Sequence, residues 1–166
     1  MTTARSEITG AVLGSKLYVI GGFENGRSTV YAVKVYDPIA NKWTTVAPLP
    51  QPLDHTAASA ASFDGKLYVV GGGYLDRDNL SDKLYIYNPD YNNWTQGVNL
   101  PGARSAMTAN FVDGILYVVG VLTIKKRWAV FWRMIHPLMH GLKSPPGLQQ
   151  QGNTSHLQLL TVNCML

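Results

Sequence analysis

The sequence predicts an all-β protein built from repeated β-sheet units, and three observations support this prediction. A phrase of about fifty residues occurs twice in full and once in part, as expected of structural units of one kind that stack on one another. Short runs that are apolar at every position recur in this phrase, and such runs are typical of strands buried on both faces. A turn-forming pair precedes each run, which favours tight β-hairpins.

A predicted hairpin opens each copy of the repeat. Its first strands are expected at residues 9–13, 58–63 and 108–112, and its apolar second strands at residues 17–20, 67–70 and 116–119. The pairs that join these strands suit positive φ angles, and they are Gly14-Ser15, Asp64-Gly65 and Asp113-Gly114. A double glycine then allows close backbone approach in the first two copies, whereas Val121 takes the place of the second glycine in the third copy.

The second half of each full copy predicts another hairpin. Its strands are expected at residues 30–36 and 83–87, followed by fourth strands that begin with Trp43 and Trp94. An Asx-Pro pair follows each third strand, which is typical of a turn. A tyrosine precedes each tryptophan with six residues between them. We expect the tryptophan rings to fill the gap between stacked units, because an aromatic ring buries a large apolar area.

The double glycine followed by Tyr, six residues and Trp resembles the kelch repeat, and the resemblance covers residues 1–120. It implies an all-β, incomplete kelch-type β-propeller in which each repeat is one four-stranded blade. Two blades are expected at about residues 5–50 and 53–101, with a part-blade at 104–120. Closed propellers have about four to eight blades, so we expect a truncated fragment of a larger propeller. Open blade faces and edges then favour self-association.

The composition changes where the repeat stops. Residues 1–120 hold 9 Lys and Arg against 10 Asp and Glu, a net charge of −1, while residues 121–166 hold 5 bases and no acid, so the two parts account for the total of +4. Three interpretations of this unpatterned basic tail stay open. It is non-native sequence that follows a frameshift, a retained intron or an assembly error. Alternatively, Lys125-Lys126-Arg127 beside Trp128 contacts an anionic membrane or a nucleic acid, or the tail is a disordered extension.

Residue types that carry catalysis or bind metals form no convincing group. His136 and His140 are four apart, but Pro137 separates them and no carboxylate is near, so no zinc site is predicted. The single cysteine, Cys164, lies outside the repeats and offers them no disulfide framework. We therefore predict no catalytic residue, no metal and no cofactor. We expect no nucleic-acid partner and no membrane span, and the sequence assigns no compartment.

Binding residues are expected on loops, because a rigid scaffold commonly carries its binding groups there. One set of loops follows each double glycine, and another set precedes each blade; both should emerge on one face of the blade array. The predicted partner-binding residues of the first set are Glu24, Asn25, Arg27, Tyr74, Asp76 and Arg77, and those of the second set are Arg5, His55 and Arg104.

Arg5 and Arg104 each lie 13 positions before a strand tyrosine, Tyr18 and Tyr117, while His55 takes the equivalent place in the second copy. The kelch resemblance implies that arginines at such places grip acidic peptides. The alternative is that both arginines donate hydrogen bonds to loop carbonyls between blades. Both interpretations stay open at this point.

The resemblance implies a non-catalytic module that binds a protein or peptide, with carbohydrate as another ligand class to consider. A kelch-like propeller enzyme that acts on sugars, of mutarotase type, is the alternative for the parent protein. A copper radical oxidase is disfavoured, because its tyrosine–cysteine crosslink needs a cysteine near the site. A product without independent function is the third interpretation.

Overall fold

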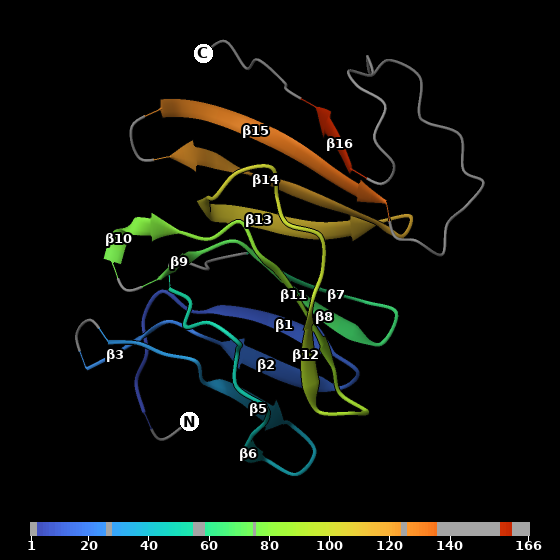
Figure 1. The fold of residues 1–166 in the computed structure, drawn as a ribbon. Coiled ribbons are helices and arrows are strands. Elements are labelled where there is room, and N and C mark those ends of the chain that lie inside the picture. Colours follow the sequence, from blue (N-terminus) through green and yellow to red (C-terminus); the bar gives the residue numbers. More distant parts are fainter. Residues whose placement is uncertain are drawn as a thin grey trace.

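The structure of the chain is a computed structural model. It describes the backbone of residues 3–25, 28–54, 59–74, 76–123, 126–135 and 157–160, and the side chains of residues 3–25, 28–54, 59–74 and 79–119. The architecture is a stack of antiparallel β-sheets (Figure 1). The described residues contain no helix long and apolar enough to cross a membrane.

The first two sheets have four strands each and the same topology. The first consists of β1 (Thr9–Leu13), β2 (Lys16–Ile20), β5 (Val33–Asp37) and β6 (Lys42–Thr45), in that spatial order. The second consists of β7 (Ala60–Phe63), β8 (Lys66–Val70), β11 (Leu84–Asn88) and β12 (Asn93–Gln96). These sheets match the two predicted blades and confirm the all-β, partial-propeller fold class.

Each double glycine leads into a small hairpin that the sequence analysis did not predict. The first hairpin pairs β3 (Phe23–Glu24) with β4 (Ser28–Thr29), and the second pairs β9 (Gly73–Tyr74) with β10 (Asp76–Leu80). The third strand of the first blade therefore begins at Val33 rather than at residue 30. The close approach predicted for the glycines is confirmed at Gly71, whose φ is +60° and where a Cβ atom would lie 2.7 Å from the carbonyl oxygen of Arg104.

A third four-stranded sheet extends beyond the boundary that we predicted at residue 120. It consists of β13 (Ser105–Val112), β14 (Ile115–Thr123), β15 (Lys126–Ile135) and β16 (Leu157–Leu160), in that order. The sequence predicted only its inner hairpin, because the second glycine and the Tyr-six-Trp phrase are missing there. Strand pairing uses backbone N–H and C=O groups, which any non-proline residue provides.

Where side chains are described, two apolar clusters hold the stack together, one at each interface between the four-stranded sheets. Strand alternation sends neighbouring residues to opposite faces. In β8, Leu67 and Val69 join the cluster with the first sheet, while Tyr68 and Val70 join the cluster with the third. All four side chains of this run are at most 3% exposed, which confirms a strand buried on both faces. The equivalent Leu17 of β2 is 39% exposed instead, because it lies on the face of the first sheet that points away from the second.

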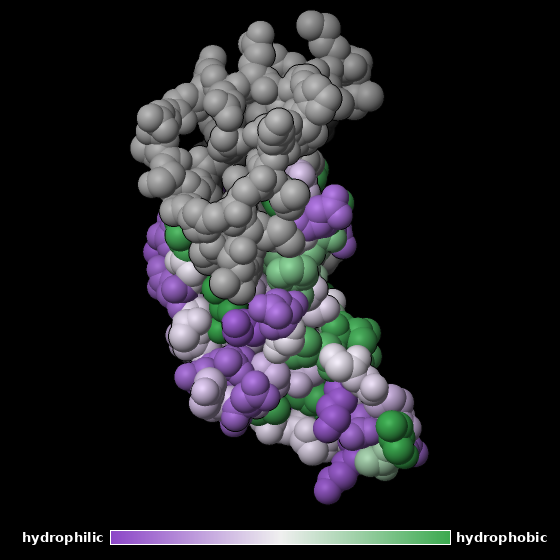
Figure 2. All heavy atoms as spheres, turned by 90° about the vertical axis from the view of Figure 1, so that its right-hand side faces the viewer, coloured by the Kyte–Doolittle hydropathy of each residue, from purple (hydrophilic) through white to green (hydrophobic). Residues whose placement is uncertain are grey.

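Apolar side chains also reach the surface of the first sheet. Ile39, in the turn between β5 and β6, is 89% exposed, and Val12 of β1 is 59% exposed. Figure 2 shows hydrophobic groups among hydrophilic ones at the lower end of the described surface, the end to which the first sheet belongs.

Candidate binding surface on the small hairpins

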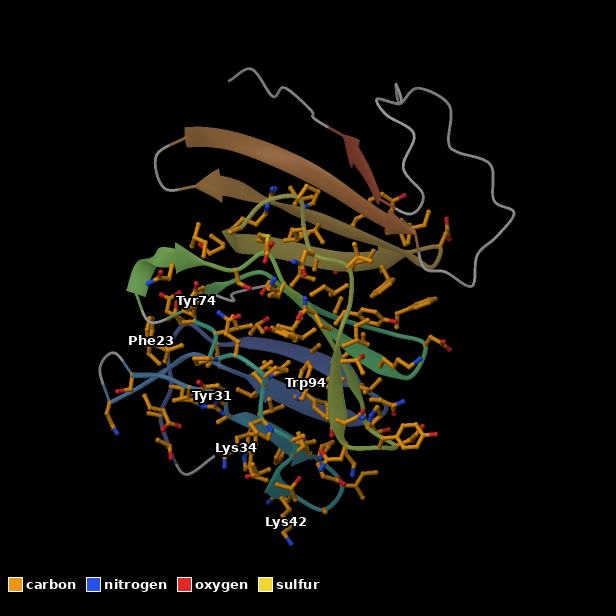
Figure 3. All side chains as sticks on the ribbon, viewed as in Figure 1. Phe23, Tyr31, Lys34, Lys42, Tyr74 and Trp94 are labelled. Carbon is orange, nitrogen blue, oxygen red and sulfur yellow. The ribbon has the colours of Figure 1, made fainter. Side chains whose placement is uncertain are left out.

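The β3–β4 and β9–β10 hairpins lie on the same side of the molecule, which we call the hairpin face. Figure 3 places Phe23 of β3 and Tyr74 of β9 there. The segment that precedes each blade pairs with the hairpin beside it, through the isolated bridges Ser6↔Phe23 and Asp54↔Gly73. Backbone hydrogen bonds therefore fix the base of each hairpin to the connecting segment.

Arg5 lies beneath the first hairpin, and its side chain is fully buried. Its Nη1 atom donates hydrogen bonds of 2.9 Å to the carbonyl oxygens of Gly21 and Ala32. Burial lowers the pKa of Arg5, and the nearby carboxylate of Glu24 partly opposes this effect. Arg5 thus binds loop carbonyls, as the alternative to peptide binding predicted. Both carbonyls, however, belong to the first repeat rather than to two blades.

Glu24 and Asn25 form the described part of the first hairpin tip. The Oε1 atom of Glu24 lies 3.9 Å from Nε of Arg5, and the Glu24 side chain remains 26% exposed. Asn25 is exposed and has a φ of 48° in the turn after β3. Both side chains are therefore accessible to a partner in front of the hairpin face.

Asp54 connects the two hairpins, and the sequence analysis did not select it. Asp54 is fully buried, and its Oδ2 atom accepts a 2.6 Å hydrogen bond from Oγ1 of Thr29 in β4. Its backbone exchanges hydrogen bonds of 2.8 and 2.7 Å with Gly73 of β9. The only sequence signal is an acidic residue directly after Leu53 in the connecting segment. Ala103 stands at the equivalent place in the next copy, so the repeat pattern does not mark it.

Arg104 lies beneath the second hairpin, as Arg5 does beneath the first. Its side chain is fully buried, and its Nε atom donates a 2.9 Å hydrogen bond to the carbonyl oxygen of Gly102. Burial lowers its pKa. Its backbone accepts a hydrogen bond from the N–H of Gly72 and donates one to the carbonyl of Ser81. Arg104 is therefore part of the scaffold that carries β9 and β10.

The remaining predicted binding residues belong to the second hairpin or to undescribed positions. Tyr74 is half-buried on β9. Asp76 and Arg77 lie on β10, but their side chains are outside the described residues. Arg27 and His55 also lie outside them. Where side chains are described, no three His, Cys, Asp or Glu residues group as metal ligands would.

The hairpin face thus combines a rigid base with different tips. Glu24 and Tyr74 take the same place after the two double glycines, so one hairpin presents a carboxylate and the other a phenol ring. A carboxylate accepts hydrogen bonds, and a tyrosine offers both apolar area and a hydroxyl group. Together they can contact an extended peptide by hydrogen bonds and by apolar packing.

Comparison with known proteins agrees with this geometry. The family model described as "Kelch motif" matches residues 4–50 and 55–101. Kelch-like protein 35 of Mus musculus is 34% identical over 113 residues, which cover 68% of this chain and 19% of that protein. Alpha-scruin of Limulus polyphemus is 27% identical over 125 residues, which cover 72% of this chain and 13% of that protein.

A solved structure shares the arrangement of the sheets. The structure of YjhT superposes with a TM-score of 0.62 and is 26% identical, over 74% of this chain and 36% of that one. The chain spans less than a fifth of the length of the two curated relatives, and about a third of the YjhT chain.

Proposed function

Because this chain belongs to the kelch-repeat family, we propose that it is a non-catalytic binding module whose hairpin face binds a protein or peptide. The observation that carries the proposal is the link between the two hairpins through Asp54, Thr29 and Gly73. It joins two loops from different repeats into one surface. Loops on a rigid scaffold are a common place for recognition residues.

The buried residues and the accessible residues of the hairpin face differ in a way that supports this proposal. Arg5 and Arg104 are buried and bind carbonyl groups of the scaffold. The accessible residues, Glu24, Asn25 and Tyr74, differ from those at the matching places of the other repeat. A scaffold can use the same residue type at matching places of different blades, whereas recognition of one particular partner needs residues that differ between them.

A peptide selection tests the proposal directly. A displayed library of random peptides is selected against the full chain, and the dissociation constants of the selected peptides are measured. We expect Tyr74→Ala and Glu24→Gln to weaken binding at least about tenfold, which corresponds to about 1.4 kcal/mol. Lys42→Ala is the matched control, because Lys42 is an exposed residue on β6 of the first sheet. It should leave binding unchanged.

Two results would contradict the proposal. Selected peptides that bind equally well to the hairpin variants would place recognition elsewhere on the molecule. Binding and turnover of a sugar, followed by NMR of its anomers, would favour the mutarotase-type alternative. Nothing in the described geometry favours that alternative over peptide binding.

A further inference from the structure

A cavity of about 440 Å³ lies between the second and third sheets. Its described lining includes Leu84 and Ile86 of β11 and Phe111 of β13, together with Lys66, the first residue of β8. The β9–β10 hairpin follows the other end of β8, so this cavity is separate from the hairpin face. A cavity of this size that combines apolar groups with a few polar ones is typical of a site for a small molecule.

Lys66 is the cationic group of this cavity among the residues with described side chains. It is half-buried, and no ion pair or hydrogen bond in that part of the chain involves its ammonium group. Asp64 lies close to it in sequence, in the turn before β8, but no ion pair joins these two described side chains. Removing an ammonium group from water without a counterion costs free energy, so this position favours an anion.

The equivalent lysine of the first repeat, Lys16, already has its counterion. Its Nζ atom lies 3.2 Å from Oδ2 of Asp37. In the second repeat, Asn88 takes the place of Asp37 at the end of the third strand of the blade. An amide has no negative charge, so Asn88 cannot replace this ion pair for Lys66.

The two repeats also differ in the acids around their cavities. Lys16 lines a cavity between the first and second sheets, and Asp90 lines the same cavity. Among the described residues that line the cavity at Lys66, none is Asp or Glu. Residues 121–166 contain no Asp or Glu, so the strands β15 and β16 of the third sheet have no acidic side chain to bring there.

We propose that this cavity binds a small molecule with an apolar body and one carboxylate. Lys66 binds the carboxylate by a charge-assisted hydrogen bond, which is stronger than one between neutral groups. The body packs against Leu84, Ile86 and Phe111, and an aryl group suits this lining because Phe111 contributes an aromatic ring. The ligand class is therefore an arylalkanoate.

Titration of the full chain with phenylbutyrate, measured by calorimetry, tests this site. Phenylbutanol has the same body without the carboxylate, and phenylbutylamine carries the opposite charge. We expect phenylbutyrate to bind more tightly than both, and Lys66→Met to weaken it about tenfold, because methionine keeps an apolar stem without the ammonium group. Lys16→Met, at the paired lysine of the first repeat, is the matched control and should leave the affinity unchanged.

Asn88→Asp tests the role of the missing counterion. It offers Lys66 the ion pair that Lys16 makes with Asp37, and this new carboxylate competes with the carboxylate of the ligand. We expect phenylbutyrate to bind about tenfold more weakly to this variant, while phenylbutanol binds as before.

Two results would overturn the proposal. One is the absence of saturable phenylbutyrate binding to the full chain. The other is equal affinity of phenylbutyrate for the unchanged chain, Lys66→Met and Asn88→Asp. Circular dichroism of each variant verifies that the sheets are formed.

Discussion

Asn41 and Asn92 occupy the same place in two repeats, in the turn that leads to the tryptophan strand, and both have a φ of 48°. Asparagine tolerates this left-handed conformation better than most residues. Each accepts a hydrogen bond from its tyrosine, but only Asn92 also binds the backbone of a neighbouring blade. The same residue is therefore part of a local turn in one repeat and of an interface in the other.

This difference predicts unequal effects of the same substitution. We expect Asn92→Gly to lower the free energy of unfolding by about 1 kcal/mol, because the N–H of Ala47 and the part-buried Tyr87 hydroxyl both lose their acceptor. Asn41→Gly should cost less, because water can replace its exposed hydrogen bond. Glycine keeps the positive φ at both places. Urea unfolding at low protein concentration measures both values, and equal losses would contradict an interface role for Asn92.

Asp37 makes a pH-dependent contribution to the stability of the folded state. Its pKa is lowered mainly by the backbone hydrogen bond from Ala40, and also by Lys16, whose Nζ lies 3.2 Å from Oδ2. A lowered pKa in the folded state means that Asp37 contributes stability above its unfolded pKa of ~3.9. This contribution is lost as the pH falls through the folded pKa.

Comparing unfolding of the wild-type chain and Asp37→Asn as a function of pH tests this contribution. We expect the variant to be less stable at neutral pH and the difference to shrink as the pH falls below ~3.9. Asparagine can still accept the turn hydrogen bonds, as Asn88 does for the N–H of Asp90 in the second repeat. A stability difference that does not change with pH would show that the charge of Asp37 has no role.

Among the strands, β13 attaches the third sheet to the second through an aromatic ring. Its residue Phe111 takes the place of Ser62 in the second repeat, where no aromatic ring is present. The Phe111 ring stacks on Phe63 at 4.6 Å and meets the edge of Tyr68 at 4.8 Å. Such ring pairs stabilise packing beyond the area that they bury.

Phe111→Ala should therefore loosen the third sheet selectively. We expect a loss of about 2–4 kcal/mol at this interface, with a value near the lower end because the ring is half-buried. Amide hydrogen exchange should become faster in β13 and β14 and stay slow in β2 and β5 of the first sheet. Uniformly faster exchange in all three sheets would contradict this local attachment.

The three four-stranded sheets form a stack, and the second sheet packs against the first on one face and against the third on the other. One apolar cluster joins it to the first sheet and the other joins it to the third. In such arrays, stability is approximately a sum of blade and interface contributions. Asn92 and Phe111 belong to different interfaces and share no described partner.

This arrangement predicts additive effects for changes at the two interfaces. The double variant Asn92→Gly with Phe111→Ala should lose the sum of the two single losses, to within about 0.5 kcal/mol. A double-mutant cycle from urea unfolding measures the coupling. A coupling well above this limit would mean that the two interfaces interact energetically through the second sheet.

Local sequence was enough to predict most of the architecture. The Asp64-Gly65 pair has positive φ at both residues, as the hairpin prediction required, and β1 spans Thr9–Leu13 as predicted. Trp94 packs between the first two blades, as predicted, whereas Trp43 lies in the cross-strand row of Leu17 on the face of the first sheet that points away from the second. These features depend on residues close together in sequence or on their repetition.

The sequence by itself thus determined the strands and turns of the two blades and the kelch repeat, because alternation, turn chemistry and period are local properties. Only the tertiary structure decided that Arg5 and Arg104 point into the scaffold, and that Asp54 binds Thr29 across two repeats. It also decided that Leu17 stays exposed while its repeat counterpart Leu67 is buried. The physical reason is that burial and pairing depend on which residues from distant parts of the chain lie opposite, and identical motifs differ in what lies opposite them.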